Sequence, residues 1–155
     1  MTKYSLTRRV NYSPEQIYHI AGDVAAYKEF LPLIKKSDVH NITRLPGGRI
    51  AFDAELTIAY KKLGIRETMT SKVVLDPADM TVKTSCADGP VKSLESEWKL
   101  VPAGPAGTEI QFTVDYTLKS RSLQFLISGM FDMLLRKILT AFELRAQKLY
   151  GAAAA

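Results

Sequence analysis

The feature of this sequence that most constrains its fold is a change in the spacing of apolar residues along the chain. From Lys36 onward, apolar and polar residues alternate with period 2 for about eighty residues, which is the pattern of strands with one face buried and the other in water. Clusters containing Gly, Pro or Asp interrupt the alternation and predict turns. These clusters lie at 46–48, 62–64, 76–79, 88–90 and 104–107. The stretch therefore predicts an antiparallel meander of six strands.

Two short helices are predicted between a first strand and this meander. Residues 3–12 alternate well enough for the strand. The Ser-Pro-Glu-Gln sequence at 13–16 then has the N-cap, the first-turn proline and the capping-box glutamine of a helix start. A second short helix through Tyr27 and Phe30 has to end before Pro32, because the residue that precedes a proline disfavours helical backbone.

The strand from Arg49 to Lys61 predicts that the sheet is curved. Its large apolar residues face one way and its charged residues the other. At about 3.4 Å per residue the strand spans roughly 40 Å, which is long for a globular protein, so we expect it to bend. A bent sheet has a concave side that another element has to cover.

The residues from 120 or 121 to Tyr150 predict that element. Apolar residues recur there at helical spacing and cover roughly half of a helix circumference, and a helix of nearly thirty residues would be about 45 Å long. We therefore expect an α+β fold in which a curved antiparallel sheet of about seven strands wraps around a long C-terminal helix. Residues 1–150 are expected to form one domain, and the alanine-rich residues 151–155 a disordered tail.

Charge and hydropathy leave several partners open. The net charge of +5 and the isoelectric point near 9.3 permit contact with phospholipid headgroups or RNA. The basic pairs at 8–9, 35–36, 61–62 and 136–137 are scattered, which is typical of solvated surface, and DNA is not expected as a partner. No run approaches the roughly 18 apolar residues of a membrane span, and no signal segment is evident. We expect a cytoplasmic protein, with peripheral contact at the inner face of the cell membrane as an option.

The lone Cys86 alternates with apolar residues, which favours a buried thiol in a reducing compartment.

Residues for catalysis or metal binding do not cluster in the sequence. His19 lies beside apolar neighbours on the first short helix, and His40 follows Asp38 in a predicted edge strand. Neither accompanies a recognisable nucleophile motif, no His and Cys residues have metal-ligand spacing, and the glycine patterns of nucleotide-binding loops are missing. We therefore expect no enzyme activity, no metal and no cofactor other than a bound ligand.

Trp98, the single tryptophan of the chain, is predicted to point inward. After the tight turn at 88–90, Leu94 and Trp98 share one strand parity while charged residues take the other. Because a curved sheet and a straight helix diverge at one end, we expect an apolar tunnel beside the indole, with the two short helices at its mouth.

Three groups of residues resemble a known family. They are Val24, Tyr27 and Phe30-Leu31-Pro32; Asp88-Gly89-Pro90 with Lys92, Leu94 and Trp98; and Ala141-Phe142-Glu143 with Arg145-Ala146. With these motifs the chain resembles the START-like, helix-grip superfamily over its whole length, and in particular the branch that binds coenzyme Q. That branch usually has Trp-Cys after Leu-Pro and Phe after Gly-Pro, whereas this chain has Leu33-Ile34 and Val91, which removes aromatic surface at the mouth.

The resemblance implies a non-catalytic carrier or chaperone for ubiquinone or another isoprenoid lipid, in support of respiration. The predicted ligand-binding residues, taken from the inward rows and the mouth, are Phe30, Leu31, Pro32, Phe52, Leu56, Ile58, Met69, Leu94, Trp98, Phe112, Val114, Met130, Leu134 and Ile138. The predicted polar contacts are Glu67, Tyr60 and Tyr116. The segment 30–32 is expected to form a membrane-facing lip, with Lys35 and Lys36 near anionic headgroups.

The roles of two charged residues and the choice of one alternative function stay open. Glu67 has inward parity, so it has to be paired, bonded to a ligand carbonyl or placed at the open end of the tunnel. Arg145 falls on the apolar arc of the last helix, where it either snorkels to solvent or pairs with an inward acid. Bacterial members of the same branch are similar to a ribosome-association toxin, which binds the large ribosomal subunit and blocks subunit pairing. That role needs a contiguous basic face.

Overall fold

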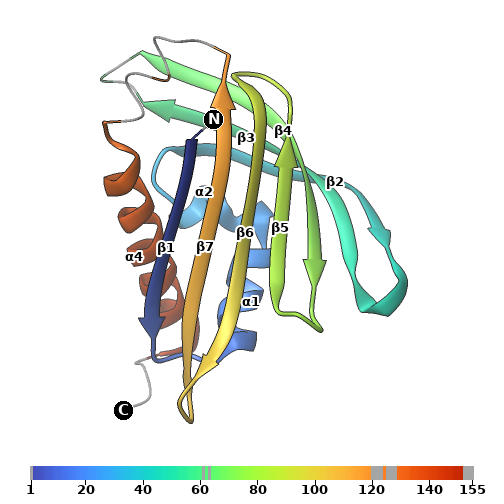
Figure 1. Cartoon of the computed structure of the whole chain (residues 1–155), viewed down its shortest axis with the longest axis vertical. Coiled ribbons are helices and arrows are strands. Elements are labelled where there is room, and N and C mark those ends of the chain that lie inside the picture. The colour runs from blue at the N-terminus through green and yellow to red at the C-terminus, as the bar shows by residue number, and fades with distance from the viewer. Residues whose placement is uncertain (1, 61, 63, 120–123, 125–128, 152–155) are drawn as a thin grey trace.

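The computed structural model describes residues 2–60, 62, 64–119, 124 and 129–151, and its elements follow the predicted order (Figure 1). In chain order they are β1 (Thr2–Val10), α1 (Pro14–Gly22), the 3-10 turn η1 (Val24–Ala26), α2 (Tyr27–Phe30), β2 (Ile34–Arg44), the 3-10 turn η2 (Pro46–Gly48), β3 (Ile50–Tyr60), β4 (Ile65–Asp76), β5 (Thr81–Cys86), β6 (Val91–Ala103), β7 (Gly107–Leu118) and α4 (Phe131–Tyr150). The α+β class is confirmed.

The strands form one seven-stranded antiparallel sheet in the order β1-β7-β6-β5-β4-β3-β2. Strands β2 to β7 are the predicted meander, in which each strand pairs with its neighbour in the chain, and β1 joins the sheet by pairing with β7. Helices α1, α2 and α4 lie on one side of the sheet, and β2 and β3 turn away from the direction of β1 and β7 (Figure 1). The predicted curved sheet around a C-terminal helix is therefore confirmed.

The start of α1 is held by the predicted capping box. The Ser13 Oγ accepts a hydrogen bond from the Gln16 backbone N–H at 3.2 Å, and the Gln16 Oε1 accepts one from the Ser13 N–H at 2.9 Å. These two bonds satisfy backbone donors that a helix start otherwise leaves unpaired. The helix then buries Ile17, Ile20 and Ala21 in the core.

The second short helix is broken into η1 and α2, which the sequence pattern did not predict. Helix α2 ends at Phe30, because Leu31 is extended (ψ 139°) ahead of Pro32. Leu33 then takes a left-handed backbone (φ 70°), which is uncommon for a bulky residue. Its carbonyl accepts the Ala59 N–H of β3 at 2.9 Å, so the segment after α2 is fixed to the sheet.

The turn at Asp88-Gly89-Pro90 docks on β4. Gly89 has φ 61°, and a Cβ atom there would lie 2.4 Å from the Thr68 carbonyl oxygen, so glycine is required. The Asp88 carboxylate accepts the Thr70 N–H at 3.0 Å. Packing of a turn against a strand therefore explains this motif.

The C-terminal helix is shorter than predicted. Helix α4 begins at Phe131, after a turn at 129–130, and the predicted earlier start would place Gly129 inside the helix at a cost of about 1 kcal/mol relative to alanine. Residues 120–123 and 125–128 of the predicted helix lie outside the described residues, as do 152–155 of the predicted tail. The 20 residues of α4 correspond to a length of about 30 Å.

Hydrogen bonds from the N-terminal part of the chain fasten α4 to the sheet. Arg8 of β1 donates to the Glu143 Oε1 at 2.9 Å and to the Thr140 Oγ1 at 2.8 Å. The Tyr12 hydroxyl donates to the Gly151 carbonyl at 2.8 Å. The middle of α4 is thereby bonded to β1, and the residue after its C-terminal end is bonded to Tyr12, which follows β1.

The largest core cluster contains an aromatic stack between β6 and α4. Trp98 is 7% exposed, and its ring stacks on Phe142 with centroids 4.5 Å apart and planes at 8°. Phe112 of β7 also lies 4.5 Å from the indole. A second, smaller cluster consists of Met69, Cys86 and Val91. The predicted burial of the free Cys86 is confirmed.

We expect Phe142→Ala to lower the free energy of unfolding by about 3–5 kcal/mol, because it deletes a fully buried ring and leaves a cavity beside the indole. Chemical denaturation followed by Trp98 fluorescence measures this loss. Leu144→Ala is a matched control on the same helix: Leu144 is 59% exposed, so its truncation is expected to change stability by no more than about 0.5 kcal/mol. Equal losses in the two variants would contradict the placement of Phe142 in the core.

Candidate functional site

Trp98 points inward as predicted, but the hollow expected beside its indole is filled. Phe142 of α4 covers one face of the ring, and Phe112 packs against it from β7. The tunnel prediction is therefore wrong at this position, because the helix brings an aromatic side chain of its own into the gap between helix and sheet. The other predicted residues in this cluster are Phe52, Phe112, Val114 and Tyr116. Contact of any of them with a ligand stays a prediction.

Five predicted apolar residues of β3, β6 and α4 are only half-buried, and we call them the inner wall. They are Leu56 and Ile58 of β3, Leu94 of β6, and Leu134 and Ile138 of α4. Strand alternation and the four-residue spacing on α4 bring them toward the space between sheet and helix. Leu56, Leu94 and Ile138 pack against the large core cluster, while Leu56, Ile58 and Leu94 also pack against the small one. Leu56 and Leu94, which pack against both clusters, thus keep part of their apolar surface uncovered.

The predicted polar contacts lie beside the inner wall. Glu67 of β4 is directly opposite Ile58, and Tyr116 of β7 is directly opposite Leu94. Glu67 is half-buried, whereas Tyr116 is 2% exposed. Tyr60, also half-buried, ends β3 two positions after Ile58. The structure therefore brings a carboxyl group and two phenol groups to one apolar surface.

The remaining predicted residues are divided between the core and the surface. Met69 is buried opposite Leu56, and Met130 is half-buried at the N-cap of α4. The lip at 30–32 is half-buried after α2. The lip lies next to α4.

Arg145 anchors the lip to α4. Its guanidinium lies 5.1 Å from the centroid of the Phe30 ring and 3.3 Å from the Glu29 Oε1, and 13% of its side chain is exposed. Arg145 pairs with an acid, but the predicted inward acid is wrong, because Glu29 of α2 is 56% exposed. The Phe30 ring also meets Phe142 at 5.6 Å, which connects the lip to the core stack.

Tyr27 supports the same segment from inside. Its hydroxyl donates to the Ala21 carbonyl, and its ring contacts those of Phe30 and Phe142. Burial, and secondarily the Asp23 carboxylate, raises the pKa of the Tyr27 hydroxyl above its ordinary value of 10.0.

This pKa shift predicts a loss of stability at alkaline pH. Above pH 10.0 an unfolded Tyr27 releases its proton while the folded one retains it, so the stability it contributes is present below that pH and declines as the pH rises toward the folded pKa. We expect Tyr27→Phe to lower the free energy of unfolding by about 1 kcal/mol near neutral pH, because the hydrogen bond is lost. The variant is also expected to lose less stability than the wild type as the pH rises above 10.0. Denaturant titrations from about pH 8 to pH 11 measure both effects. An identical flattening in Tyr150→Phe would show that the effect does not come from Tyr27.

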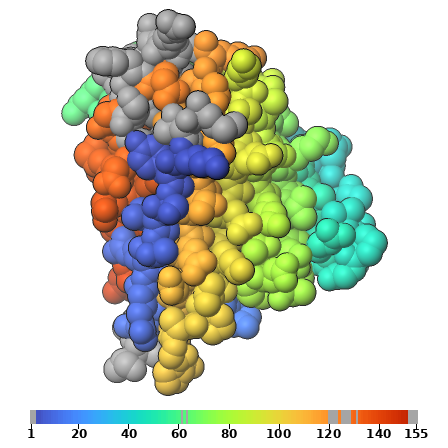
Figure 2. Space-filling view, viewed as in Figure 1, coloured from blue at the N-terminus to red at the C-terminus, as the bar shows by residue number. Residues whose placement is uncertain are grey.

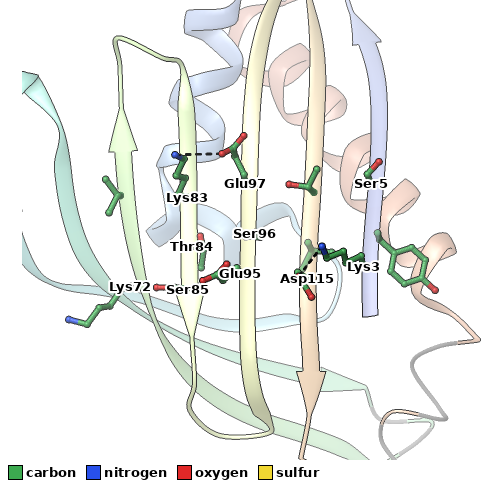
Figure 3. A pocket seen from close by; sticks show the side chains of 14 residues that line it. Lys3, Ser5, Lys72, Lys83, Thr84, Ser85, Glu95, Ser96, Glu97 and Asp115 are labelled. Carbon is green, nitrogen blue, oxygen red and sulfur yellow. Dashed lines mark ion pairs between the residues drawn. The ribbon is translucent and has the colours of Figure 1, made fainter. Parts of the chain in front are cut away.

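Neither Trp98 nor the inner wall lines any of three concavities that described residues form. The largest, about 950 Å³, is a broad trough on the outer face of the sheet, the face that Figure 2 shows. Its charged side chains pair across strands (Figure 3), Lys83 with Glu97 at 3.7 Å and Lys3 with Asp115 at 3.8 Å. Exposed ion pairs of this kind contribute little energy, and we assign the trough no function.

The other two concavities adjoin the lip. One, of about 660 Å³, runs between segment 30–32 and α4, and includes Met133 and Leu144. The other, of about 290 Å³, contains His19 and Arg145. Sequence reasoning did not single out Met133 or Leu144, because neither belongs to the main apolar stripe of α4. Their exposure in the folded chain is what identifies them.

Two further classes of site are missing from the part of the chain that the structure describes. No group of three or more His, Cys, Asp or Glu side chains is placed there to hold a metal ion. Within the same residues, none of the helices is both long and apolar enough to cross a membrane.

A curved antiparallel sheet that holds a C-terminal helix against its concave face defines the helix-grip class of domains. Residues 10–143 match the family described as polyketide cyclase / dehydrase and lipid transport. The chain belongs to this START-like family, in the branch that includes ribosome association toxins and coenzyme Q-binding proteins. The resemblance predicted from the motifs is therefore confirmed.

Two relatives and one solved structure illustrate the match. The ribosome association toxin RatA of Escherichia coli is 30% identical over 152 residues, which are 98% of this chain and 91% of that protein. The mitochondrial coenzyme Q-binding protein COQ10 of Drosophila melanogaster is 31% identical over 143 residues, 90% of this chain but 56% of that protein. The solution structure of an 18 kDa protein from Caulobacter crescentus is 30% identical, with a TM-score of 0.81 and coverage of 98% of this chain and 100% of the other.

Proposed function

We propose that the chain binds ubiquinone or another isoprenoid lipid and carries or shelters it without changing it chemically. The observation that supports this proposal is the inner wall, where five aliphatic side chains from β3, β6 and α4 keep part of their surface uncovered by the described residues. A lipid transport family and a relative named for coenzyme Q binding are consistent with such a ligand.

The inner wall suits the chemistry of a prenylated quinone. Each five-carbon prenyl unit contributes up to about 4 kcal/mol when it is fully buried, before ordering costs, so two or three units are enough for micromolar binding. A quinone carbonyl needs a hydrogen-bond donor in an apolar setting. The Tyr116 hydroxyl adjoins the wall at Leu94, and the Glu67 carboxyl adjoins it at Ile58.

A carrier role is proposed in preference to catalysis because neither histidine of the chain lies at the inner wall. The family description includes cyclases and dehydrases as well as lipid transport, so family membership alone does not decide between them. The two histidines, His19 on α1 and His40 on β2, are both exposed. Neither is among the residues of the inner wall, where a reaction on a bound lipid would take place.

Delivery of a membrane lipid also requires contact with a bilayer. We place this contact at the lip, where segment 30–32 is half-buried and Lys35 and Lys36 follow as exposed residues at the start of β2. The location that fits is the inner face of the cell membrane, reached from the cytoplasm.

The lipid proposal predicts that the native protein carries an isoprenoid lipid into an organic extract, where mass spectrometry identifies it. A short-chain ubiquinone analogue is expected to quench Trp98 fluorescence saturably. We expect Ile58→Lys to weaken this binding by at least about tenfold, because it places a charge on the apolar wall, while its long stem allows the fold to persist. The matched control is Ile42→Lys at a site that is 67% exposed on β2. A lipid-free protein with no saturable quenching would contradict the proposal.

Ribosome association is a second candidate function, favoured by the extent of one match. The chain covers 91% of the length of a relative named as a ribosome association toxin, against 56% of the coenzyme Q-binding relative. Among the described residues of the basic pairs, Arg8 is engaged by Glu143 and Arg136 by Asp132. Lys35, Lys36 and Lys62 remain exposed.

Sedimentation of ribosomes tests this second candidate. If it holds, added protein reduces the fraction of paired subunits, and reversal of the charges at Lys35, Lys36 and Lys62 abolishes the effect, because phosphate contacts supply most of such affinity. Lys99→Glu on the outer face of β6 is the control for a change of net charge. Unchanged ribosome profiles at saturating protein would eliminate this function.

A further inference from the structure

Helix α4 carries a second apolar stripe on its solvent side. Its buried stripe contains Leu135, Leu139, Phe142 and Ala146. On the other side, Met133 is 48% exposed and Leu144 is 59% exposed, with Lys137 between them at helical spacing from each. The outer face of a helix in a globular domain is normally polar. Two large exposed aliphatic side chains on one line therefore need a physical explanation.

The stripe forms one wall of a groove whose other wall is the lip. The groove has a volume of about 660 Å³, and segment 30–32 faces Met133, Ala141 and Leu144 across it. Apolar side chains from two separate elements thus converge on one surface. A single exposed leucine is ordinary, but a contiguous apolar groove marks an interaction site.

The rim of the groove is basic. Lys28, Arg136 and Lys137 line it together with the acids Glu29 and Asp132. Both acids are engaged, Asp132 with Arg136 of the same rim at 3.0 Å and Glu29 with Arg145 at 3.3 Å, and Lys28 lies 4.0 Å from Asp38. Among the described residues none forms an ion pair with Lys137, and Lys35 and Lys36 are exposed just beyond the lip. The groove therefore presents apolar side chains with the positive charge of Lys137 at its rim and those of Lys35 and Lys36 beyond the lip.

This combination favours one kind of partner. A nucleic acid would use the basic rim but gains little from exposed Met and Leu side chains, and a second copy of this chain would bring the same positive charge to the interface. A bilayer that contains anionic phospholipids uses both features, because aliphatic side chains enter the acyl boundary while lysines meet the headgroups.

We propose that the groove between α2 and α4 is a docking surface for an anionic phospholipid bilayer, with Met133 and Leu144 inserted and Lys137 at the headgroups. The proposal rests on the lipid-carrier function and extends the membrane contact from the lip to the length of α4. Because Met133 and Leu144 lie on the opposite side of α4 from its buried stripe, docking is separable from ligand binding at the inner wall.

Vesicle flotation with the full chain tests the docking surface. The vesicles consist of phosphatidylcholine alone or of phosphatidylcholine with about a third of phosphatidylglycerol, a proportion high enough to give a negative surface potential. The wild-type chain is expected to float with the anionic vesicles and not with the neutral ones, and high salt is expected to weaken this binding.

Two variants and their matched controls locate the contact. Leu144→Asp is expected to weaken vesicle binding at least about tenfold, since it removes an inserted side chain and adds a negative charge. Ile42→Asp, at the 67% exposed Ile42, leaves binding unchanged. Lys137→Glu reverses one charge and is expected to weaken binding roughly 20- to 30-fold, whereas Lys99→Glu on the outer sheet face has a much smaller effect. Circular dichroism and thermal unfolding confirm that each variant is folded.

The outcomes separate the docking proposal from the lipid-carrier proposal. Quenching of Trp98 by a soluble short-chain ubiquinone analogue, without vesicles, is expected to be the same in Leu144→Asp and the wild type. Equal flotation of Leu144→Asp, Ile42→Asp and the wild type would overturn the docking surface even if quenching is intact. Self-association that Leu144→Asp abolishes, without vesicle binding, would instead assign the groove to a second copy. Anionic flotation without any quenching would leave docking supported and overturn the carrier function.

Discussion

The contact between Trp98 and Phe142 is the interaction on which the rest of the structure depends. It joins the middle of β6 to α4, the helix that covers the concave side of the sheet. Phe112 approaches the same pair from β7 and Phe30 from the lip. Large aromatic rings bury more area than any aliphatic side chain, and their stacking adds about 0.5–1.5 kcal/mol per pair. Sheet, helix and lip are thereby held at a single point.

This stack also divides the space between sheet and helix into two parts. On one side, Leu100, Ile110 and Ala146 are completely or almost completely buried, as expected for a close-packed interior. On the other side, Leu94 and Ile138 keep part of their surface uncovered. Burial of that remaining area by an apolar ligand is favourable at roughly 25 cal/mol per Å². One end of the domain is thus close-packed, while the other keeps apolar surface uncovered.

Periodicity was sufficient to predict the strands, their inward residues and the capping box at Ser13, because each depends on neighbours along the chain. It failed where distant residues meet. Parity places Trp98 on the inner face, but it does not show that Phe142 fills the space beside it. A helical pattern that continues through Gly129 does not reveal that α4 begins at Phe131. The left-handed Leu33 and the exposed Met133 have no sequence signal, since both follow from how α2 and α4 pack.

The position of β1 in the sheet has a consequence for how the protein is made. Within the sheet β1 pairs with β7, the last strand among the described residues, so during translation β1 has no partner until the other strands of the sheet have been synthesised. Pairings between residues far apart in sequence are slow to form, and unpaired strand edges are prone to aggregate. The hydrogen bonds from Arg8 to α4 have to wait still longer. Protection of this first strand while the chain grows would therefore govern how much native protein a cell obtains.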